Sequence, residues 1–228
     1  IDANSPAAIT SVSIPNSSMN VGDVVTVTIT ASETGLTFSG TPTVGGFTVG
    51  SLSDIGDNTY TAQFTVAEGG TDVAAGSDIP VSMILADAAG NTTATYTTAI
   101  SQAGDDIDAN SPTIASVAVA DGTYGVGDTV AVTITAGSSE TGLTLAGSFN
   151  GQALTNITES GGGTYTGTYT VVEGNSNVAD GANVTTSITL TDAAGNASAA
   201  TTAVALSGES IDANSPAAIT SVSIPNSS

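Results

Sequence analysis

Hydrophobic and polar residues alternate along several short stretches of the sequence, in which Val, Ile, Thr and Tyr predominate. Clear examples are Val24–Thr30 (VVTVTIT), Thr59–Val66, Val130–Thr135 and Thr164–Val172. A period of two puts every second side chain on the same face, as in a half-buried β-strand. Gly, Asp and Asn separate these stretches, and no stretch has the helical period. The pattern therefore predicts an all-β protein.

Several motifs occur twice, with their copies 105 to 107 residues apart. The paired motifs are IDANSP at Ile1 and Ile107, VGD at Val21 and Val126, SETGLT at Ser32 and Ser139, and DAAGN at Asp87 and Asp192. A further IDANSP begins at Ile211, where Ile211–Ser228 repeats Ile1–Ser18 letter for letter. The repeats predict one domain over residues 1–105, a second over 106–209, and the first strand of a third over 210–228.

Seven short strands are expected in each domain. In the first domain they are Ala8–Ile14, Val24–Ala31, Leu36–Gly40, Phe47–Leu52, Thr59–Val66, Ile79–Ala86 and Thr93–Ile100. Many short strands with turn residues between them, in about a hundred residues, favour an immunoglobulin-like β-sandwich. We therefore expect tandem immunoglobulin-like sandwiches arranged end to end.

The chain carries no Lys, Arg, His or Cys, and its 21 Asp and Glu residues give a formal charge of −21. Phosphate backbones and anionic lipid surfaces require cationic side chains, so we expect neither a nucleic-acid partner nor membrane insertion of this segment. A nucleophilic triad would need a His or Lys base. Paired carboxylates alone, with few aromatic residues beside them, make catalysis improbable, so we expect no enzyme.

The acidic residues recur at positions that strand order places at the two ends of each domain. The N-terminal end is expected to gather the linker, the loop after the second strand and the loop after the sixth. Its candidate residues are Asp2, Asn4, Glu33 and Asp87 in the first domain, Asp108, Asn110, Glu140 and Asp192 in the second, and Asp212 and Asn214 in the third. Asp105, Asp106 and Glu209 lie in the connections. The C-terminal end is expected to gather Asp23, Glu68 and Asp72, or Asp128 and Glu173.

Stacked domains would bring these acids together without any cation to neutralise them. Two carboxylates about 4 Å apart repel by roughly 4 kcal/mol at an effective dielectric constant near 20. Ca²⁺ accepts carboxylate, amide and carbonyl oxygens in irregular geometry, whereas Mg²⁺ demands a strict octahedron and Zn²⁺ prefers Cys or His. Calcium is therefore the expected ion. The alternative is that the DAAGN and VGD aspartates only form turns and that IDANSP is an ordinary linker.

The IDANSP linker, the SETGLT and TYT strands and the DAAGN loop together resemble the bacterial Ig-like tandem repeats of large calcium-dependent surface adhesins of the RTX type. The resemblance covers both repeats and the third, truncated start. It implies β-sandwich extenders that calcium stiffens at the junctions, with Asp108, Asn110, Glu140 and Asp192 as ligands and Asp105 or Asp106 added from the preceding repeat.

The expected function is a non-catalytic spacer in an extracellular stalk on the cell surface, with neighbouring repeats of the same array as partners. One alternative is a secreted fibre of identical chains, assembled by strand addition or lateral packing, because the C-terminal segment repeats a first strand without the rest of its domain. A second alternative is a module that binds carbohydrate or ice.

Overall fold

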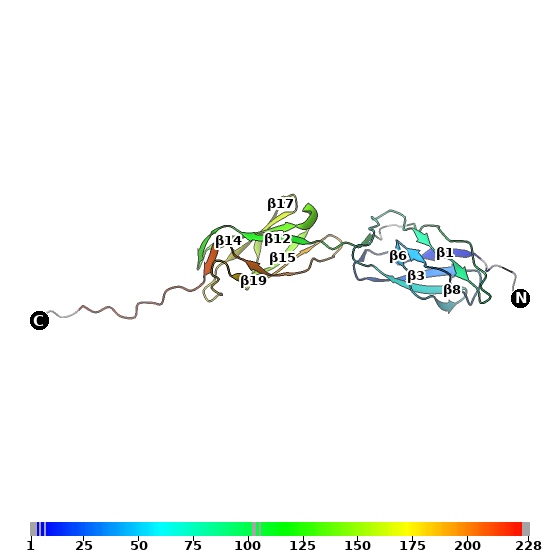
Figure 1. The fold of residues 1–228 in the computed structure, drawn as a ribbon, viewed down its shortest axis with the longest axis horizontal. Helices are drawn as coiled ribbons and strands as arrows, with labels where there is room; N and C mark the ends of the chain where they lie inside the picture. The colour runs from blue at the N-terminus through cyan, green and yellow to red at the C-terminus, as the bar shows by residue number, and fades with distance from the viewer. Residues whose placement is uncertain (1–3, 5, 7, 102–103, 105, 225–228) are drawn as a thin grey trace. The chain divides into compact units, whose positions relative to one another are not determined.

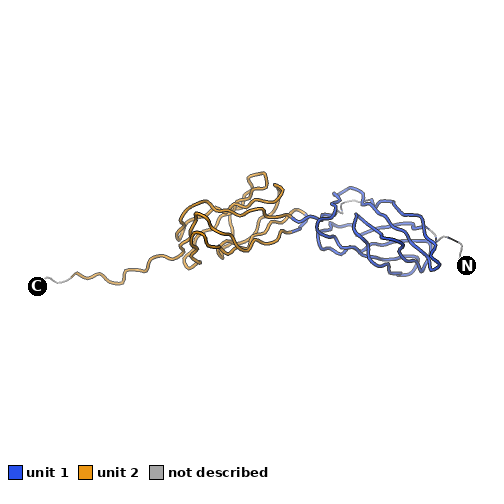
Figure 2. Tube along the Cα trace, viewed as in Figure 1, with its two compact units in different colours: residues 1–111, 194–196 blue, residues 112–193, 197–228 orange. Residues whose placement is uncertain are grey.

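The structure is a computed structural model that describes residues 4, 6, 8–101, 104 and 106–224. The chain divides into two compact units (Figures 1 and 2). Unit 1 comprises residues 1–111 and 194–196, and unit 2 comprises residues 112–193 and 197–228. Among the described residues the only helix is a 3-10 turn, Gly137–Ser139. The all-β fold class is confirmed.

One layer of unit 1 is a four-stranded antiparallel sheet in the order β1-β3-β8-β7. Its strands are β1 (Ile9–Ser13), β3 (Val24–Ala31), β8 (Thr59–Thr65) and β7 (Ser53–Gly56). Strands β3 and β8 form its centre, with Val24 opposite Thr65 and Thr30 opposite Thr59. Every second residue of β3 is buried, as the alternation of the sequence predicts.

The second layer of unit 1 is made of shorter pairings. Strand β5 (Thr43–Val44) lies between β6 (Phe47–Thr48) and β9 (Val81–Ser82), and β4 (Thr37–Phe38) pairs with β10 (Leu85–Ala86). The stretch expected as a strand at residues 93–100 forms no continuous ladder with its neighbour. Isolated bridges join Met83 to Tyr96 and Ile79 to Ile100, and the Thr93 amide donates to the Leu85 carbonyl at 2.8 Å. Its bridges are too widely spaced to form a continuous ladder.

Unit 2 repeats this plan with longer strands. One sheet has the order β12-β14-β18-β17, and the other has the order β16-β15-β19-β20. Their bounds are β12 Ile114–Val119, β14 Thr129–Ala136, β18 Thr164–Thr170, β17 Thr155–Gly161, β16 Gln152–Ala153, β15 Thr144–Phe149, β19 Asn183–Thr191 and β20 Thr201–Ala205. Both units are therefore two-layered sandwiches of immunoglobulin-like strand order.

Each unit has a hydrophobic core of its own between its two sheets. In unit 1 the core includes Ile29, Tyr60 and Leu85, which are all fully buried. In unit 2 it includes Ile134 and Ile188, also fully buried. Burial of a side chain of this size contributes about 1.5–3 kcal/mol, so each core is able to hold its unit together independently.

The IDANSP copies at Ile107 and Ile211 end a unit instead of beginning one. Two short parallel pairs show this: β11 (Ile107–Asp108) with β2 (Met19–Asn20), and β21 (Glu209–Asp212) with β13 (Gly122–Gly125). We call residues 107–111 and 211–215 the exit segments of units 1 and 2.

The side chains at alternate positions of each exit segment explain this assignment. Ile107 and Ala109 are 1% and 0% exposed and lie in the core of unit 1, and Ile211 and Ala213 lie in the core of unit 2. The boundary consequently lies between Ser111 and Pro112, where the repeats had placed it after residue 105. The apolar side chains of these two exit segments are thus buried in the core of the unit that precedes them.

Residues 213–224 form no strand in the structure, although the repeat predicts the first strand of a third domain there. Ile219, Val222 and Ile224 are 84%, 84% and 90% exposed. Ile9 and Val12, which occupy the matching positions of β1, are buried in the core of unit 1. The same letters thus form a strand only where β3 lies beside them.

Candidate functional site

Two acidic side chains of unit 1 hold its exit segment from the side. Asp72 Oδ1 accepts hydrogen bonds from the Ala109 amide at 2.8 Å and from Asn110 Nδ2 at 2.7 Å. The Glu68 carboxylate accepts from the Ser111 amide at 3.0 Å and from Ser111 Oγ at 2.7 Å. These bonds give an acceptor to donor groups that would otherwise lack one at the end of the strand. We call this arrangement the clasp of unit 1.

Unit 2 has the same clasp, with its acceptors 105 residues and its donors 104 residues further along the chain. Asn177 Oδ1 accepts from the Ala213 amide at 2.7 Å and from Asn214 Nδ2 at 2.8 Å. The Glu173 carboxylate accepts from the Ser215 amide at 3.0 Å and from Ser215 Oγ at 2.6 Å. The equivalence of Asp72 and Asn177 shows that the clasp needs an oxygen acceptor at this position and not a negative charge.

We expect the exchange Asp72→Asn to change the stability of unit 1 by less than about 0.5 kcal/mol, because the amide keeps the accepting oxygen. Asp72→Ala is expected to cost about 1–3 kcal/mol, because the buried Ala109 amide loses its acceptor. Urea unfolding of the whole chain measures both, with the transition of unit 2 as the internal reference. Equal losses for the two variants would instead show that the charge of Asp72 matters.

The VGD aspartates close turns. Asp23 Oδ2 accepts from the Asn20 amide at 2.8 Å, and Asp128 Oδ2 accepts from the Gly125 amide at 2.8 Å. Gly22, directly before Asp23, has a φ of +91°, which a glycine adopts without strain. The turn-forming interpretation of VGD therefore accounts for both acids.

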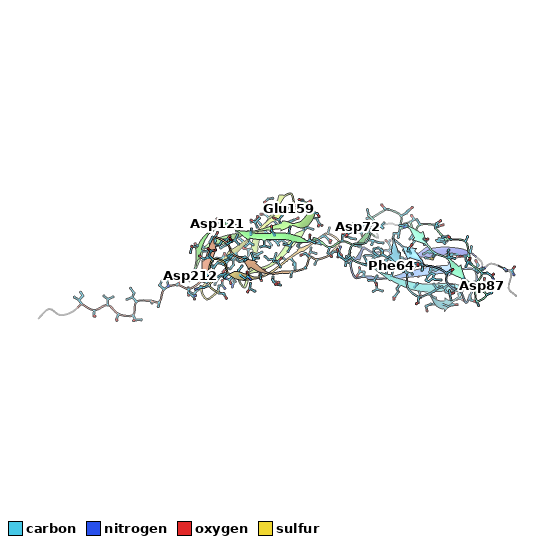
Figure 3. The ribbon with its side chains drawn as sticks, in the orientation of Figure 1. Phe64, Asp72, Asp87, Asp121, Glu159 and Asp212 are labelled. Atoms are coloured by element: carbon cyan, nitrogen blue, oxygen red, sulfur yellow. The ribbon has the colours of Figure 1, made fainter. Side chains whose placement is uncertain are left out.

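The other end of each unit gathers the acidic loops that follow the second and sixth predicted strands. Ala86 lies opposite Thr37 in unit 1, so the loops that carry Asp87 and Glu33 emerge side by side. Thr191 lies opposite Thr144 in unit 2, which brings the loops of Asp192 and Glu140 together in the same way. Within unit 1, Asp87 and the clasp residue Asp72 lie at opposite ends (Figure 3).

Asp87 is held by its own DAAGN loop. Its Oδ1 accepts from the amides of Ala89 and Asn91, both at 2.9 Å, and its Oδ2 accepts from Asn91 Nδ2 at 2.8 Å. The hydrogen bond from the Asn91 side chain, together with these amides, lowers the pKa of Asp87 below its usual value. Asp87 therefore stays ionised and keeps its loop in one conformation.

A buried tyrosine fixes the loop after the second strand in each unit. The Tyr60 hydroxyl donates to the Glu33 carbonyl at 2.8 Å, and the Tyr165 hydroxyl donates to the Glu140 carbonyl at 3.2 Å. Burial raises the pKa of Tyr165 above its usual value. The role of these tyrosines could not be predicted from sequence, although both stand at the centre of the repeated TYT.

The linker residues Asp108 and Asn110 complete unit 1, where the repeats had placed them at the start of the second domain. Both belong to the exit segment of unit 1, beside the clasp, and the Asp108 Oδ1 accepts from the Asn110 amide at 3.2 Å. Asp212 and Asn214 have the same arrangement in unit 2, with the corresponding bond at 3.2 Å. The reason is the burial of Ile107 and Ala109, which draws the motif into the preceding core.

The remaining predicted ligands are distributed over several places. Glu209 is 7% exposed in β21 and accepts a hydrogen bond from the Ser207 amide. The Asp106 carbonyl accepts from the Met19 amide at 2.9 Å, Asn4 is exposed, and Asp2 and Asp105 lie outside the described residues. Within residues 4, 6, 8–101, 104 and 106–224, no three acidic side chains are grouped closely enough to hold a metal ion.

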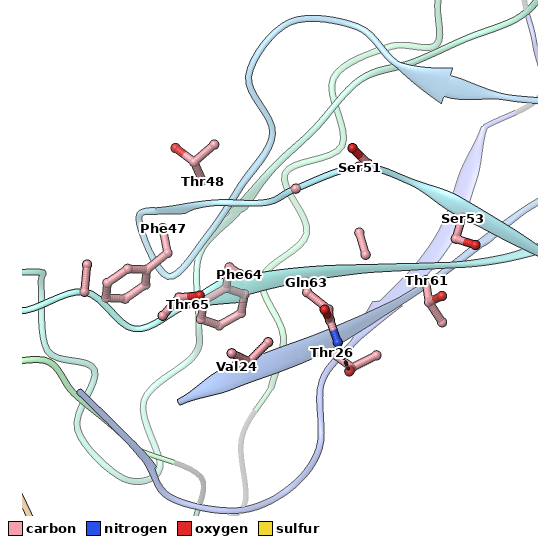
Figure 4. A pocket seen from close by; sticks show the side chains of 13 residues that line it. Val24, Thr26, Phe47, Thr48, Ser51, Ser53, Thr61, Gln63, Phe64 and Thr65 are labelled. Atoms are coloured by element: carbon pink, nitrogen blue, oxygen red, sulfur yellow. Dashed lines mark hydrogen bonds between the residues drawn. The ribbon is translucent and has the colours of Figure 1, made fainter. Parts of the chain in front are cut away.

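A groove of about 1110 Å³ crosses the outer face of the first sheet of unit 1 (Figure 4). Thr26, Thr61 and Gln63 contribute polar side chains, and Gln63 Nε2 donates to Thr26 Oγ1 at 3.4 Å. Its two phenylalanines, Phe47 and Phe64, stack on each other at 5.6 Å and are buried. The groove therefore presents hydroxyl groups but no exposed aromatic face on which a sugar ring would stack.

No described helix is long and apolar enough to cross a membrane. No protein-family model matches the sequence, and neither does any curated protein.

Solved structures resemble the chain only in their fold. Fibronectin(III)-like modules of Clostridium thermocellum CbhA are 17% identical at a TM-score of 0.38, over 90% of this chain and 94% of theirs. The I67–I69 fragment of the titin I-band is 11% identical at 0.39, over 92% and 66%. Murine CEACAM1b is 13% identical at 0.33, over 89% and 100%. At these values the similarities assign no family and no activity to the chain.

Proposed function

We propose that the chain is a non-catalytic extender segment of a large extracellular adhesin or surface stalk. The observation that carries this proposal is that a single residue separates the last bonded residue of unit 1 from the first bonded residue of unit 2. Ser111 is still bonded to Glu68 of unit 1, and the Thr113 carbonyl already accepts from the Gly137 amide of unit 2 at 2.8 Å. Only Pro112 intervenes, and its ring fixes one of its two backbone dihedrals. Such a connection contains almost no chain that belongs to neither unit, unlike a long flexible linker.

The strong negative charge supports the same role. With 21 acidic residues and no basic ones, neighbouring chains repel one another and remain soluble. The negative charge also favours binding of a cation at the acidic loops, since the chain has no Lys, Arg or His to neutralise them.

We place the proposed calcium at the end of each unit that carries the paired acidic loops. Glu33 and Asp87 are the candidate ligands in unit 1, and Glu140 and Asp192 are those in unit 2. The backbone pairing that brings each pair of loops together supports this choice. Further oxygens would come from loop carbonyls and from water, because calcium takes six to eight oxygen ligands. The proposal leaves out Glu68, Asp72, Glu173, Asp23 and Asp128, because they belong to the clasps and turns at the other end of each unit.

Thermal unfolding in calcium, in chelator and in magnesium tests the proposal. Calcium at a hundred times its dissociation constant adds about 2.7 kcal/mol, which corresponds to a rise of about 10–20 °C for a domain of this size. The rise in unit 1 should disappear in the double variant Glu33→Gln, Asp87→Asn. It should persist in Asp57→Asn, a change in the exposed β7–β8 turn. A midpoint that does not respond to calcium would overturn the metal but leave the extender role standing.

A fibre of identical chains is the second candidate function. The specific observation in its favour is the exposure of Ile219 and Val222, whose counterparts Ile9 and Val12 are buried beside β3. A segment with this sequence is able to occupy the place of β1 in another copy, by strand addition. Sedimentation of the same samples at rising concentration separates the candidates: an extender stays monomeric, and a fibre-forming chain associates.

A further inference from the structure

The exit segment of unit 2 is bonded along both of its edges. On one edge, β21 pairs in parallel with β13 over four residues, from Gly122 opposite Glu209 to Gly125 opposite Asp212. On the other edge, Ile211 exchanges two backbone hydrogen bonds with Val178, at 2.8 and 2.9 Å. The last strand of the unit therefore lies between two partners, and it cannot leave without breaking both sets of bonds.

The direction of the β13–β21 pair decides how tension along the chain acts on it. Tension pulls β13 towards the beginning of the chain through β12, and it pulls β21 towards the end of the chain. Because the two strands are parallel, these pulls oppose each other along the strand axis. The evenly spaced bonds of a parallel ladder are then loaded together in shear. In a pair that is pulled apart from one end, the bonds would break one after another at lower force.

We propose that the β13–β21 pair is a mechanical clamp, and that the chain bears tension along its length. This inference goes beyond the spacer role and does not depend on calcium. Unit 1 has the same arrangement with only two paired residues, Ile107 opposite Met19 and Asp108 opposite Asn20. Since fewer bonds share the load there, unit 1 yields at a lower force than unit 2, by roughly twofold if force scales with the number of pairs.

The clamp also explains the clasp at its end. Glu173 and Asn177 hold Ser215, Ala213 and Asn214, the residues at which an outside pull first reaches unit 2. Their bonds keep the pull aligned with β21, because the strand cannot bend away from the unit before they break. Tension is consequently delivered along the ladder and not across it.

A single disulfide tests the clamp in the whole chain. Thr123 and Ser210 are register partners in the parallel pair, with their hydroxyl oxygens 3.3 Å apart, and the chain has no other cysteine to interfere. The double variant Thr123→Cys, Ser210→Cys is pulled from both ends of the chain, in chelator, in a single-molecule instrument. When it is reduced, two unfolding events are expected, with that of unit 2 at the higher force.

Oxidation is expected to remove the high-force event of unit 2, because tension then passes through the cross-link and no longer loads the β13–β21 ladder. Oxidation also shortens the total length that the chain releases on unfolding, because the residues between 123 and 210 can no longer extend. The loss is about 300 Å at roughly 3.5 Å per residue, and it identifies the missing event as that of unit 2. The matched control is Thr155→Cys, Thr168→Cys, whose hydroxyl oxygens lie 3.0 Å apart between β17 and β18. This cross-link should shorten the release only slightly and leave the force unchanged.

Two results would overturn the proposal. The first is an event of unit 2 that keeps its force after oxidation of the 123–210 pair, since the barrier would then lie in the pairing of β12 with β14, outside the clamp. The second is a reduced or unaltered chain in which unit 2 yields at the same force as unit 1 or below it. Thermal unfolding of the reduced variant beforehand shows whether the substitutions themselves weaken the fold.

Discussion

A chain that ends at residue 105 is expected to contain no stable first unit, whereas a chain that ends at residue 111 is expected to fold. The shorter chain loses Ile107 and Ala109 from the core and leaves Met19 without its strand partner. Burial of the isoleucine contributes about 1.5–3 kcal/mol, the cavity adds to that loss, and each clasp hydrogen bond contributes about 1 kcal/mol. The sum is comparable with the whole stability of a small domain, about 5–15 kcal/mol.

Circular dichroism and amide dispersion in nuclear magnetic resonance spectra distinguish the two chains. A matched control removes residues 216–228 from the full chain, which should leave the unfolding midpoint of unit 2 unchanged, because the described part of that segment is exposed. A folded chain of 105 residues with an unchanged midpoint would show that the exit segment does not complete the core.

Replacing Gly147 by alanine is expected to disrupt unit 2 severely. Gly147 lies in β15 opposite Ile188 with a φ of +143°, a conformation that an L-residue rarely adopts. An added Cβ would lie 1.9 Å from the Ser187 carbonyl oxygen and 2.8 Å from the Ile188 Cα. These are backbone atoms of a central strand and cannot move aside alone. We expect a loss of at least about 4 kcal/mol, at the upper end of single substitutions.

Gly40 occupies the equivalent place in the first repeat and supplies the control. It also has a positive φ, +78°, but its added Cβ would meet nothing within 4 Å. Gly40→Ala should therefore cost only the backbone strain, about 1–2 kcal/mol. Urea unfolding of both variants measures their free energies of unfolding and thus separates the cost of backbone strain from that of the steric clash. Similar losses would mean that the conformation, and not the close approach of β19, sets the cost at Gly147.

The strands with regular alternation could be predicted from the sequence, and the phase of the repeat could not. Val24–Ala31 forms the predicted strand because its alternation requires one buried face. A repeat fixes the period of the units but not where each one begins. That choice depends on which core receives Ile107, through a pairing with Met19 that is 88 residues away. The alternate Ile and Ala of IDANSP were the local signal that the motif is a strand.

The loops that carry Glu33 and Asp87 lie at one end of unit 1, and the role of each acid depends on which donors it accepts from. Sequence identifies a carboxylate and does not identify the amide beside it. The presence of Asp72 and Asn177 at matching positions was the available signal for the clasp, because both side chains supply the oxygen that accepts from the exit segment. Glu33 and Asp87 remain predicted ligands, and their loops do emerge side by side.

The exit segments also set the order of events when the chain is made. The strand that completes each core is the last to leave the ribosome, so a unit stays open until the opening letters of the next repeat have arrived. Folding then advances in steps of one repeat, each delayed by a pairing between distant residues. During every delay an unfilled core faces the medium, and a nascent chain with acidic but no basic residues repels the neighbours that would otherwise insert a strand there.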